Sequence, residues 1–183
     1  MAGGIEDYGT HWPLWATVLH RTTGPIFEMG CGHSSTPVAH MIAGGKRLVI
    51  SADTDADWLK KFAEYQNATH EFHLVEKGPG INKDYQWRAG WLSFLDKILK
   101  RTPSFGCALI DGFPGEIRID VAKALKGRCK YQVWHDTEGL DVNGDDGGNY
   151  QWETIIGSFK HVFVWKTYRP WTAVVSDEEE FKP

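Results

Sequence analysis

Short apolar segments alternate with helical segments along most of the chain, and this alternation limits the possible folds more than any other feature. Five segments are short and nearly all apolar, as buried strands are: Pro25–Met29, Arg47–Ala52, Glu71–Glu76, Cys107–Ile110 and Lys130–Trp134. Helical segments lie between them: Thr36–Ala43, Ala56–Gln66, Trp87–Leu99 and Glu116–Leu125. Strands of this kind, separated by helices, indicate a parallel sheet that is covered on both faces.

The last part of the chain breaks this pattern. Tyr150–Phe159 is predicted to be helical, and His161–Thr167 and Trp171–Ser176 have the character of two strands separated by only a few residues. A connection this short cannot cross over the sheet, so we expect an antiparallel pair at its edge. The predicted fold is therefore α/β, with a doubly wound, mostly parallel seven-stranded sheet, a C-terminal antiparallel edge hairpin and helices on both faces.

The length of 183 residues predicts a single domain, 1–183. Residues 1–24 form an aromatic-rich extension in which a short helix is expected to begin near Pro13. This extension is expected either to lie over the carboxyl ends of the strands or simply to be anchored to the body by Trp12 and Trp15. Residues 177–183 are expected to be a solvated acidic tail.

Composition excludes several classes of partner. The net charge is −4 and the chain has no basic block, which argues against nucleic acid as a partner. No apolar run reaches membrane-spanning length, and the first residues lack the features of a signal peptide. The three cysteines, Cys31, Cys107 and Cys129, have no metal-type spacing, so we expect a reduced, cytoplasmic protein. Composition leaves open whether the protein forms a homo-oligomer.

A glycine-rich turn follows the first predicted strand. The chain reads Glu28-Met-Gly30-Cys31-Gly32-His33-Ser34-Ser35 before the next helix. Glycines allow backbone N–H groups and the positive end of that helix to approach a ligand closely. Asp53 ends the next strand, about 20 residues later, where a doubly wound sheet places a ribose-binding carboxylate. Together these features predict a cofactor that contains a nucleoside.

The turn differs from a dinucleotide-binding motif, because Ser35 stands where that motif has its third glycine. The sequence Glu28-x-Gly30-x-Gly32 resembles motif I of the class I S-adenosylmethionine-dependent methyltransferases. In that family the glycines pass under the amino-acid part of the cofactor, and the resemblance implies that Asp53 holds the ribose hydroxyls. The cofactor contacts that it implies are Glu28, Gly30, Cys31, Gly32, His33, Ser34, Ser35, Asp53, Thr54 and Asp111. Among these, we expect His33 to shape the turn and Cys31 to be no nucleophile.

Two further strand ends carry polar side chains. The fourth strand ends at Ile-Asp111-Gly, and the fifth ends at His135-Asp136. Neighbouring strands lie about 4.8 Å apart, so these three side chains are expected to form one cluster. The pattern resembles small-molecule O-methyltransferases with Ile-Asp-Gly and His-Asp strand ends, some of which bind Mg²⁺ there. The resemblance implies that Asp111, His135 and Asp136 are the catalytic residues and the ligands of Mg²⁺.

The match to the metal-binding members is incomplete. Many of them have histidine where this chain has Pro114, and the run Asp-Gly-Phe-Pro-Gly with Arg118 is closer to a related branch that includes sugar-modifying methyltransferases. If no metal binds, His135 is the expected general base. Asp111 could alternatively cap the following helix, and His135 could be a packed strand-end residue. The glycine-rich loop at 137–150 is expected to be mobile and to border the acceptor.

The function that follows is S-adenosylmethionine-dependent methylation, with a hydroxyl of a small molecule or sugar as the acceptor. A catalytically silent cofactor-binding module is one alternative, and an NAD-dependent oxidoreductase is another. Methylation of nucleic-acid bases is not expected, because the Asn/Asp-Pro-Pro-aromatic signature after the fourth strand is absent.

Overall fold

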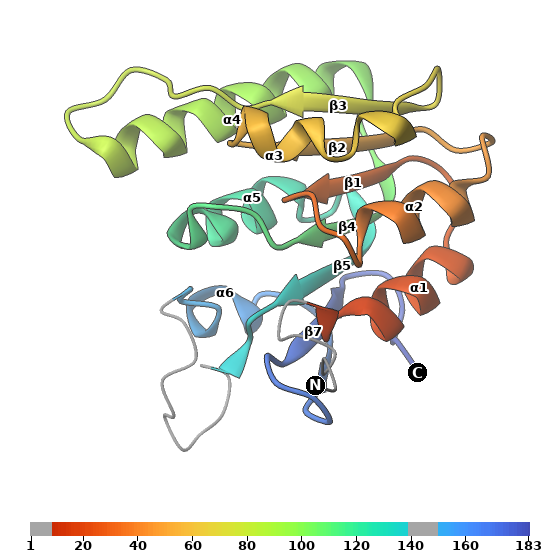
Figure 1. The fold of residues 1–183 in the computed structure, drawn as a ribbon. Helices are drawn as coiled ribbons and strands as arrows, with labels where there is room; N and C mark the ends of the chain where they lie inside the picture. Colours follow the sequence, from red (N-terminus) through yellow and green to blue (C-terminus); the bar gives the residue numbers. More distant parts are fainter. Residues whose placement is uncertain (1–8, 139–149) are drawn as a thin grey trace, which may run out of the picture.

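A computed structural model describes residues 9–138 and 150–183, so most of the predicted mobile loop lies outside the described residues. The strands form one seven-stranded sheet in the order β3-β2-β1-β4-β5-β7-β6 (Figure 1). Their bounds are β1 Ile26–Met29, β2 Val49–Asp53, β3 His70–Leu74, β4 Phe105–Ile110, β5 Cys129–His135, β6 His161–Trp165 and β7 Thr172–Ser176. Strands β1 to β5 are parallel, and β7 runs antiparallel to both of its neighbours. The predicted fold class is confirmed, with β7 placed between β5 and the edge strand β6.

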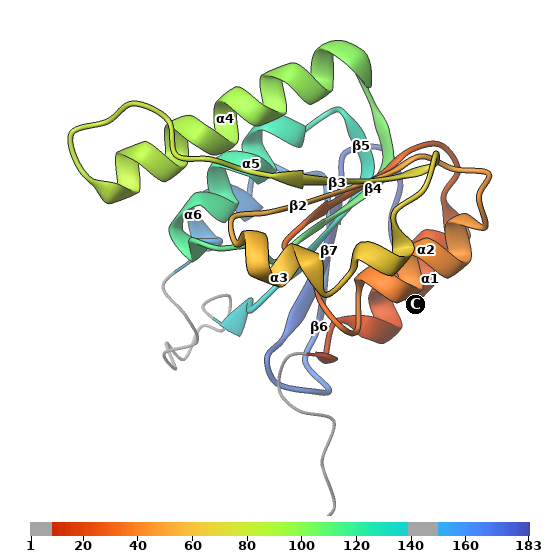
Figure 2. The same ribbon diagram turned by 45° about the horizontal axis from the view of Figure 1, so that its top comes forward.

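Helices cover both faces of the sheet (Figure 2). The helices are α1 Trp12–Arg21, α2 Thr36–Ala43, α3 Ala56–Lys60, α4 Lys83–Arg101, α5 Arg118–Leu125 and α6 Glu153–Ile156. One core lies between the sheet and α1 and α2, and the other lies under α4, α5 and α6. Because side chains alternate along a strand, Ile26 of β1 enters the first core, whereas Phe27 and Met29 enter the second. The continuous apolar character of the parallel strands follows from this double burial.

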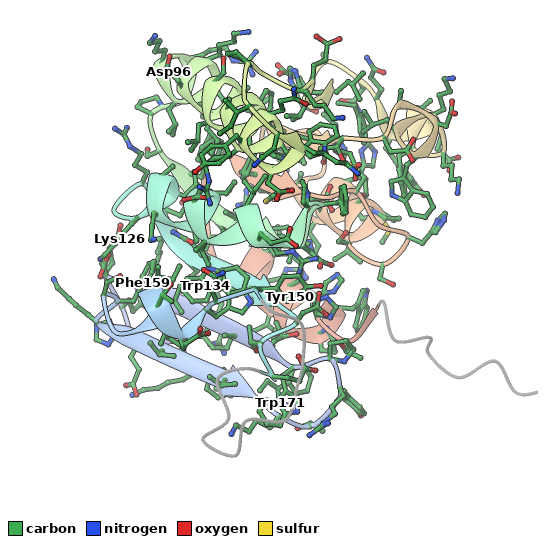
Figure 3. All side chains as sticks on the ribbon, turned by 90° about the vertical axis from the view of Figure 1, so that its left-hand side faces the viewer. Asp96, Lys126, Trp134, Tyr150, Phe159 and Trp171 are labelled. Carbon is green, nitrogen blue, oxygen red and sulfur yellow. The ribbon has the colours of Figure 1, made fainter. Side chains whose placement is uncertain are left out.

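Three predicted helices differ in the structure. The segment Ala56–Gln66 is split into α3 and a 3₁₀ turn, Ala63–Tyr65, neither of which has a buried residue that would favour one continuous helix. The segment Glu116–Leu125 begins as a 3₁₀ turn before α5. In Tyr150–Phe159 only α6 is α-helical, since Gln151 has a positive φ of 56°. Phe159 still packs against Trp134, with Lys126 over its ring (Figure 3).

The two ends of the described chain are held against the sheet. Helix α1 begins with proline in its first turn, as predicted, and its Trp15 is completely buried, whereas Trp12 is 48% exposed. Anchoring is therefore provided by Trp15 and not by Trp12. The expectation of a solvated tail after Ser176 is correct for the exposed residues 178–180 but not for Phe181, which is buried against Tyr131. No helix among the described residues is long and apolar enough to cross a membrane.

Candidate active site

A cavity of about 890 Å³ opens at the carboxyl ends of the central parallel strands. Its walls come from the turn after β1, the ends of β4 and β5, and the segment before α1. The lining residues are Gly9, His11, Cys31, Gly32, His33, Ser34, Trp58, Asp111, Arg118, His135, Asp136, Tyr150 and Pro170. Its volume lies within the range of small-molecule and cofactor sites. One cavity therefore joins the glycine turn to the cluster of polar strand ends.

The glycine turn packs directly against the end of β4. Gly30 has a positive φ of 88°, and a Cβ atom there would lie 2.7 Å from Cα of Gly112. The N–H of Asp111 also donates to the carbonyl of Met29 at 2.9 Å. Gly30 is therefore required by this backbone contact, rather than by approach of a ligand as the sequence suggested. A Cβ atom on Gly32 would instead meet a side chain, with Oγ of Ser35 at 3.0 Å, and Gly32 lines the cavity.

Glu28 lies beneath the turn and is completely buried. Its carboxylate accepts hydrogen bonds from the hydroxyls of Thr36 and Ser51 at 2.5 to 3.1 Å. The Thr36 hydroxyl in turn accepts the N–H of Gly32 at 3.0 Å. Burial raises the pKa of Glu28 to about 7. Hydrogen bonds from the hydroxyls of Ser35, Ser51 and Thr36 oppose this shift. The structure thus places Glu28 and Ser35 outside the cavity lining, where they support the turn.

Asp53 fixes the other side of the turn. One carboxylate oxygen accepts the N–H of Cys31 at 3.0 Å, and the other accepts the N–H of Asp55 at 3.0 Å. Burial raises the pKa of Asp53. Hydrogen bonds from the backbone N–H groups of Cys31, Asp55 and Thr54 oppose this shift. Neither Asp53 nor Thr54 is among the residues that line the cavity. Contact of Asp53 with a ribose stays a prediction.

Trp58 is a site residue that the sequence argument did not single out. Its Nε1–H donates to the carbonyl of Cys31 at 2.7 Å, and its ring meets the ring of His33 edge-on. His33 therefore shapes one wall, as expected. The Cys31 thiol is buried, and burial raises its pKa well above the usual range, which agrees with its lack of a nucleophilic role.

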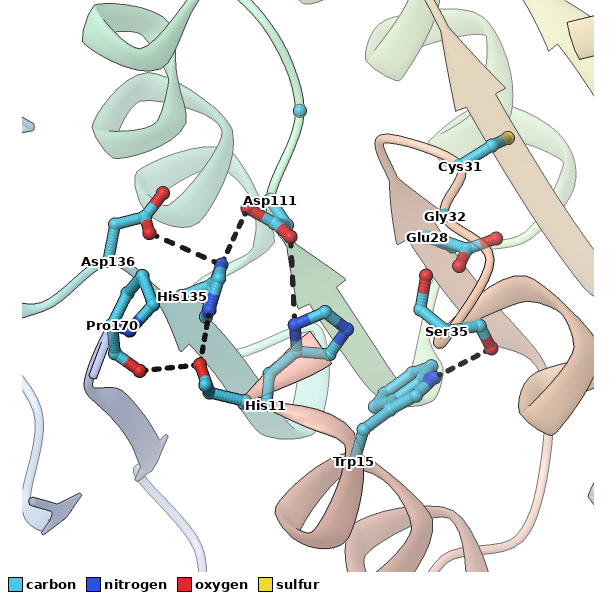
Figure 4. A network of polar contacts seen from close by, with 12 residues as sticks. His11, Trp15, Glu28, Cys31, Gly32, Ser35, Asp111, His135, Asp136 and Pro170 are labelled. Atoms are coloured by element: carbon cyan, nitrogen blue, oxygen red, sulfur yellow. Dashed lines mark hydrogen bonds and ion pairs between the residues drawn. The ribbon is translucent and has the colours of Figure 1, made fainter. Parts of the chain in front are cut away.

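The predicted convergence of Asp111, His135 and Asp136 is present in the structure (Figure 4). Oδ1 of Asp111 lies 3.1 Å from Nδ1 of His135. Arg118, at the start of α5, joins the same cluster: its guanidinium lies 3.0 Å from Asp111 and 2.7 Å from Asp136. Arg118 also donates to the carbonyl of Gly112 at 2.9 Å. The arginine that distinguished this sequence from the metal-binding pattern is thus the centre of the cluster.

These contacts do not fit the predicted magnesium site. Arg118 engages both Asp111 and Asp136, so neither carboxylate is free of a cationic partner. His135 contributes nitrogen, whereas Mg²⁺ prefers oxygen ligands in octahedral geometry. Burial raises the pKa of Asp111, but His135 and Arg118 outweigh it and the net shift is downward.

Both ring nitrogens of His135, the predicted general base, have polar partners. The hydroxyl of Thr10 donates to the carbonyl of Pro170 at 2.6 Å, so it must accept from Nε2–H of His135, 2.9 Å away. Nδ1 faces Asp111. Burial lowers the pKa of His135, but Asp111 and Asp136 outweigh it and the net shift is upward. Both ring nitrogens are therefore engaged by neighbouring groups, and the role of His135 as a general base stays a prediction.

His11 is the second residue that the sequence argument missed. It precedes α1, is 2% exposed, and its Nδ1 lies 3.7 Å from Oδ2 of Asp111. Within the described residues neither of its ring nitrogens has a hydrogen-bond partner. Its pKa is lowered to about 4, chiefly by burial, so the imidazole is neutral near pH 7. The only signal in the sequence is a histidine immediately before an amphipathic helix expected over the strand ends.

Comparison with known proteins was made on sequence and on structure. No protein-family profile and no curated protein matches the sequence. Among solved structures, a candidate O-methyltransferase from Klebsiella pneumoniae shares 12% identity over 96% of this chain and 82% of its own, with a TM-score of 0.63. The O-methyltransferase TomG from Streptomyces achromogenes, whose structure contains S-adenosylmethionine, shares 13% identity over 93% of this chain and 82% of its own (TM-score 0.60). The METTL16 methyltransferase domain shares 11% identity over 98% of this chain and 71% of its own (TM-score 0.58).

These likenesses extend over nearly the whole described chain. The protein therefore has the fold of the class I S-adenosylmethionine-dependent methyltransferases. At this level of identity the likeness defines the fold, and the chemistry has to be argued from the site.

Proposed function

We propose that the protein transfers the methyl group of S-adenosylmethionine to an oxygen of a small molecule or sugar. The observation that carries the proposal is the single cavity, which has the glycine turn on one side and the Asp111–Arg118–His135 cluster on the other. Methyl transfer needs this arrangement, because donor and acceptor must meet within one site from which bulk water is excluded.

The proposed cofactor seat is formed by Gly32, His33 and Ser34 of the turn, with the ring of Trp58 beside them. Asp53 is proposed to receive the ribose hydroxyls. A carboxylate has about four lone-pair sites, and the backbone N–H groups of Cys31, Asp55 and Thr54 do not use all of those of Asp53. Ser35 supports this choice of cofactor, since its buried side chain occupies the place of the third glycine of a dinucleotide turn.

The proposed acceptor binds at the opposite wall. The bound cofactor would supply the methyl group: its bond between sulfur and methyl carbon would break with the electron pair kept by sulfur, the acceptor oxygen would form the new bond to carbon, and the proton of the hydroxyl would pass to solvent. Asp111 and Arg118 are fixed by mutual contacts and orient the acceptor oxygen for in-line attack, and the ring of Tyr150 lies 4.3 Å from the guanidinium on the same wall. A cytoplasmic location and self-association remain predictions from the sequence.

One observation favours a second candidate, a cofactor-binding module without turnover. Asp111, Asp136, Arg118 and His135 already satisfy one another, as the polar groups of a purely structural cluster would. This candidate predicts S-adenosylmethionine binding that is unchanged by Asp111→Ala, and no methyl transfer to any acceptor.

Isothermal titration calorimetry with S-adenosylmethionine tests the proposal. Asp53→Ala is expected to weaken binding by roughly 10- to 100-fold, the value of a hydrogen bond to a charged group. Asp57→Ala is the matched control, because this exposed aspartate lies four residues away and outside the cavity lining. Absence of binding at millimolar cofactor would refute the proposal, and binding of NADH in its place would favour an oxidoreductase.

Turnover is measured separately, with S-adenosylmethionine labelled in its methyl group and a panel of sugars, catechols and phenols. Label is expected in an O-methyl product with the wild-type protein and not with Asp111→Ala. Cofactor binding without labelled product from any of these acceptors would favour the silent module.

A further inference from the structure

Three side chains from separate elements meet at the base of the cavity: His11 before α1, Asp111 after β4 and His135 at the end of β5. Each of the three residues offers one possible ligand atom, and these three atoms all lie within 4.8 Å of one another. Nδ1 of His135 is 3.1 Å from one oxygen of Asp111, and Nδ1 of His11 is 3.7 Å from the other. Ligand atoms bound tetrahedrally at about 2.1 Å are separated by roughly 3.4 Å, so this spacing suits a shared ion.

The second, independent observation is the state of His11. Its ring is buried, and neither nitrogen has a hydrogen-bond partner within the described residues. Buried polar groups are nearly always paired, so an unpaired imidazole that borders a cavity indicates a missing partner.

We propose that His11, Asp111 and His135 bind a divalent transition-metal ion of the zinc class. Two imidazole nitrogens and one carboxylate oxygen favour zinc, iron or nickel over magnesium. Three protein ligands leave a fourth position open toward the cavity, as in catalytic metal sites. This set differs from the one implied by the sequence resemblance, because His11 replaces Asp136.

The surroundings of the three ligands support the proposal. Nε2–H of His135 donates to Thr10, which donates to the carbonyl of Pro170, so the ring is held with Nδ1 toward Asp111. Ligand histidines are commonly oriented by such a bond from their second nitrogen. With Nε2 engaged by Thr10, Nδ1 is the nitrogen of His135 that would hold the ion.

Charge within the cluster also favours a cation. Asp111 and Asp136 bring two carboxylates against one guanidinium, that of Arg118. Arg118 forms ion pairs with Asp136 and with one oxygen of Asp111. The other oxygen of Asp111 faces His11. Asp136 is therefore engaged by Arg118 and does not belong to the proposed ligand set, whereas Asp111 keeps one oxygen for the ion.

The catalytic meaning of this ion rests on the proposed function. An acceptor oxygen in the open position would lose its proton more readily.

Calorimetry on chelator-treated protein, without S-adenosylmethionine, tests the inference. Wild-type protein is expected to bind one Zn²⁺ per chain from ZnCl₂ and no Mg²⁺ from MgCl₂. His11→Ala is expected to weaken Zn²⁺ binding at least about tenfold. His20→Ala is the matched control, since His20 is an exposed histidine of α1, and should bind as the wild type does.

Crystals of the wild-type protein soaked in ZnCl₂ give a second measurement that needs no variant. An anomalous peak is expected within about 2.3 Å of the three ligand atoms. A wild-type protein that binds no Zn²⁺, a peak elsewhere, or unchanged affinity in folded His11→Ala would overturn the metal site. Zn²⁺ binding without S-adenosylmethionine binding would overturn only the proposed function, and the reverse result would overturn only the metal site.

Discussion

The substitution Glu28→Gln tests how the glycine turn is supported. Burial raises the pKa of Glu28 from 4.5 to about 7, so the folded protein binds this proton more tightly than the unfolded chain. The associated stabilisation is complete below about pH 4.5 and is lost as the pH rises through 7. At about 1.36 kcal/mol per pH unit over this interval, the free energy of unfolding loses about 3 kcal/mol.

Glutamine does not titrate and keeps one oxygen as an acceptor for the hydroxyls of Thr36 and Ser51. Urea unfolding followed by tryptophan fluorescence, at about pH 4.5 and about pH 7.5, gives both free energies at each pH. The free energy of unfolding of the wild type minus that of the variant is expected to fall by about 3 kcal/mol from the lower to the higher pH. Other titrating groups cancel in this difference. A difference that stays constant or rises with pH would refute the explanation.

Two further substitutions test the contacts on either side of the turn, each by urea unfolding with a matched control. Gly30→Ala is expected to cost well over 2 kcal/mol, since left-handed strain of about 1–2 kcal/mol adds to the clash with Gly112. Gly45 has a similar φ and open space around it, so Gly45→Ala should lower the free energy of unfolding by the left-handed strain alone. Equal losses of stability in the two variants would contradict the packing argument. Arg118→Met is expected to cost about 3–5 kcal/mol because it removes the buried guanidinium that Asp111 and Asp136 share. Arg88→Met removes an exposed ion pair and should cost less than about 1 kcal/mol; a similar loss for both would contradict the role of burial.

The sheet could be predicted from the sequence because its strands are buried on both faces. Segments such as Cys107–Ile110 carry apolar side chains in both directions, and this signal needs no knowledge of the partner strand. The short link between β6 and β7 likewise permits only an antiparallel pair. Helix bounds were less predictable: α3 ends at Lys60 because this exposed segment has no buried face, a property that appears only once the fold is known.

In the site, too, contacts set by the sheet could be predicted from the sequence, whereas contacts set by helix packing could not. Asp111 and His135 end neighbouring strands, and sheet geometry alone brings them together. The position of His11 depends on how α1 packs across the sheet, and the buried face of this helix (Leu14, Trp15, Val18 and Leu19) does not by itself specify where it will lie. Glu28 was misplaced because the alternation of β1 directs it under the turn, toward the face covered by α1 and α2.

The position of β7 has a consequence for the order of folding. This strand follows β6 in the chain yet lies between β5 and β6. During synthesis, the β5 edge of the sheet therefore lacks its neighbour until residues 172–176 have left the ribosome, and β6 has no sheet to join before then. Unpaired strand edges promote association with other chains. Nascent chains that pause after residue 165 are thus the form of this protein most exposed to aggregation and most dependent on chaperones.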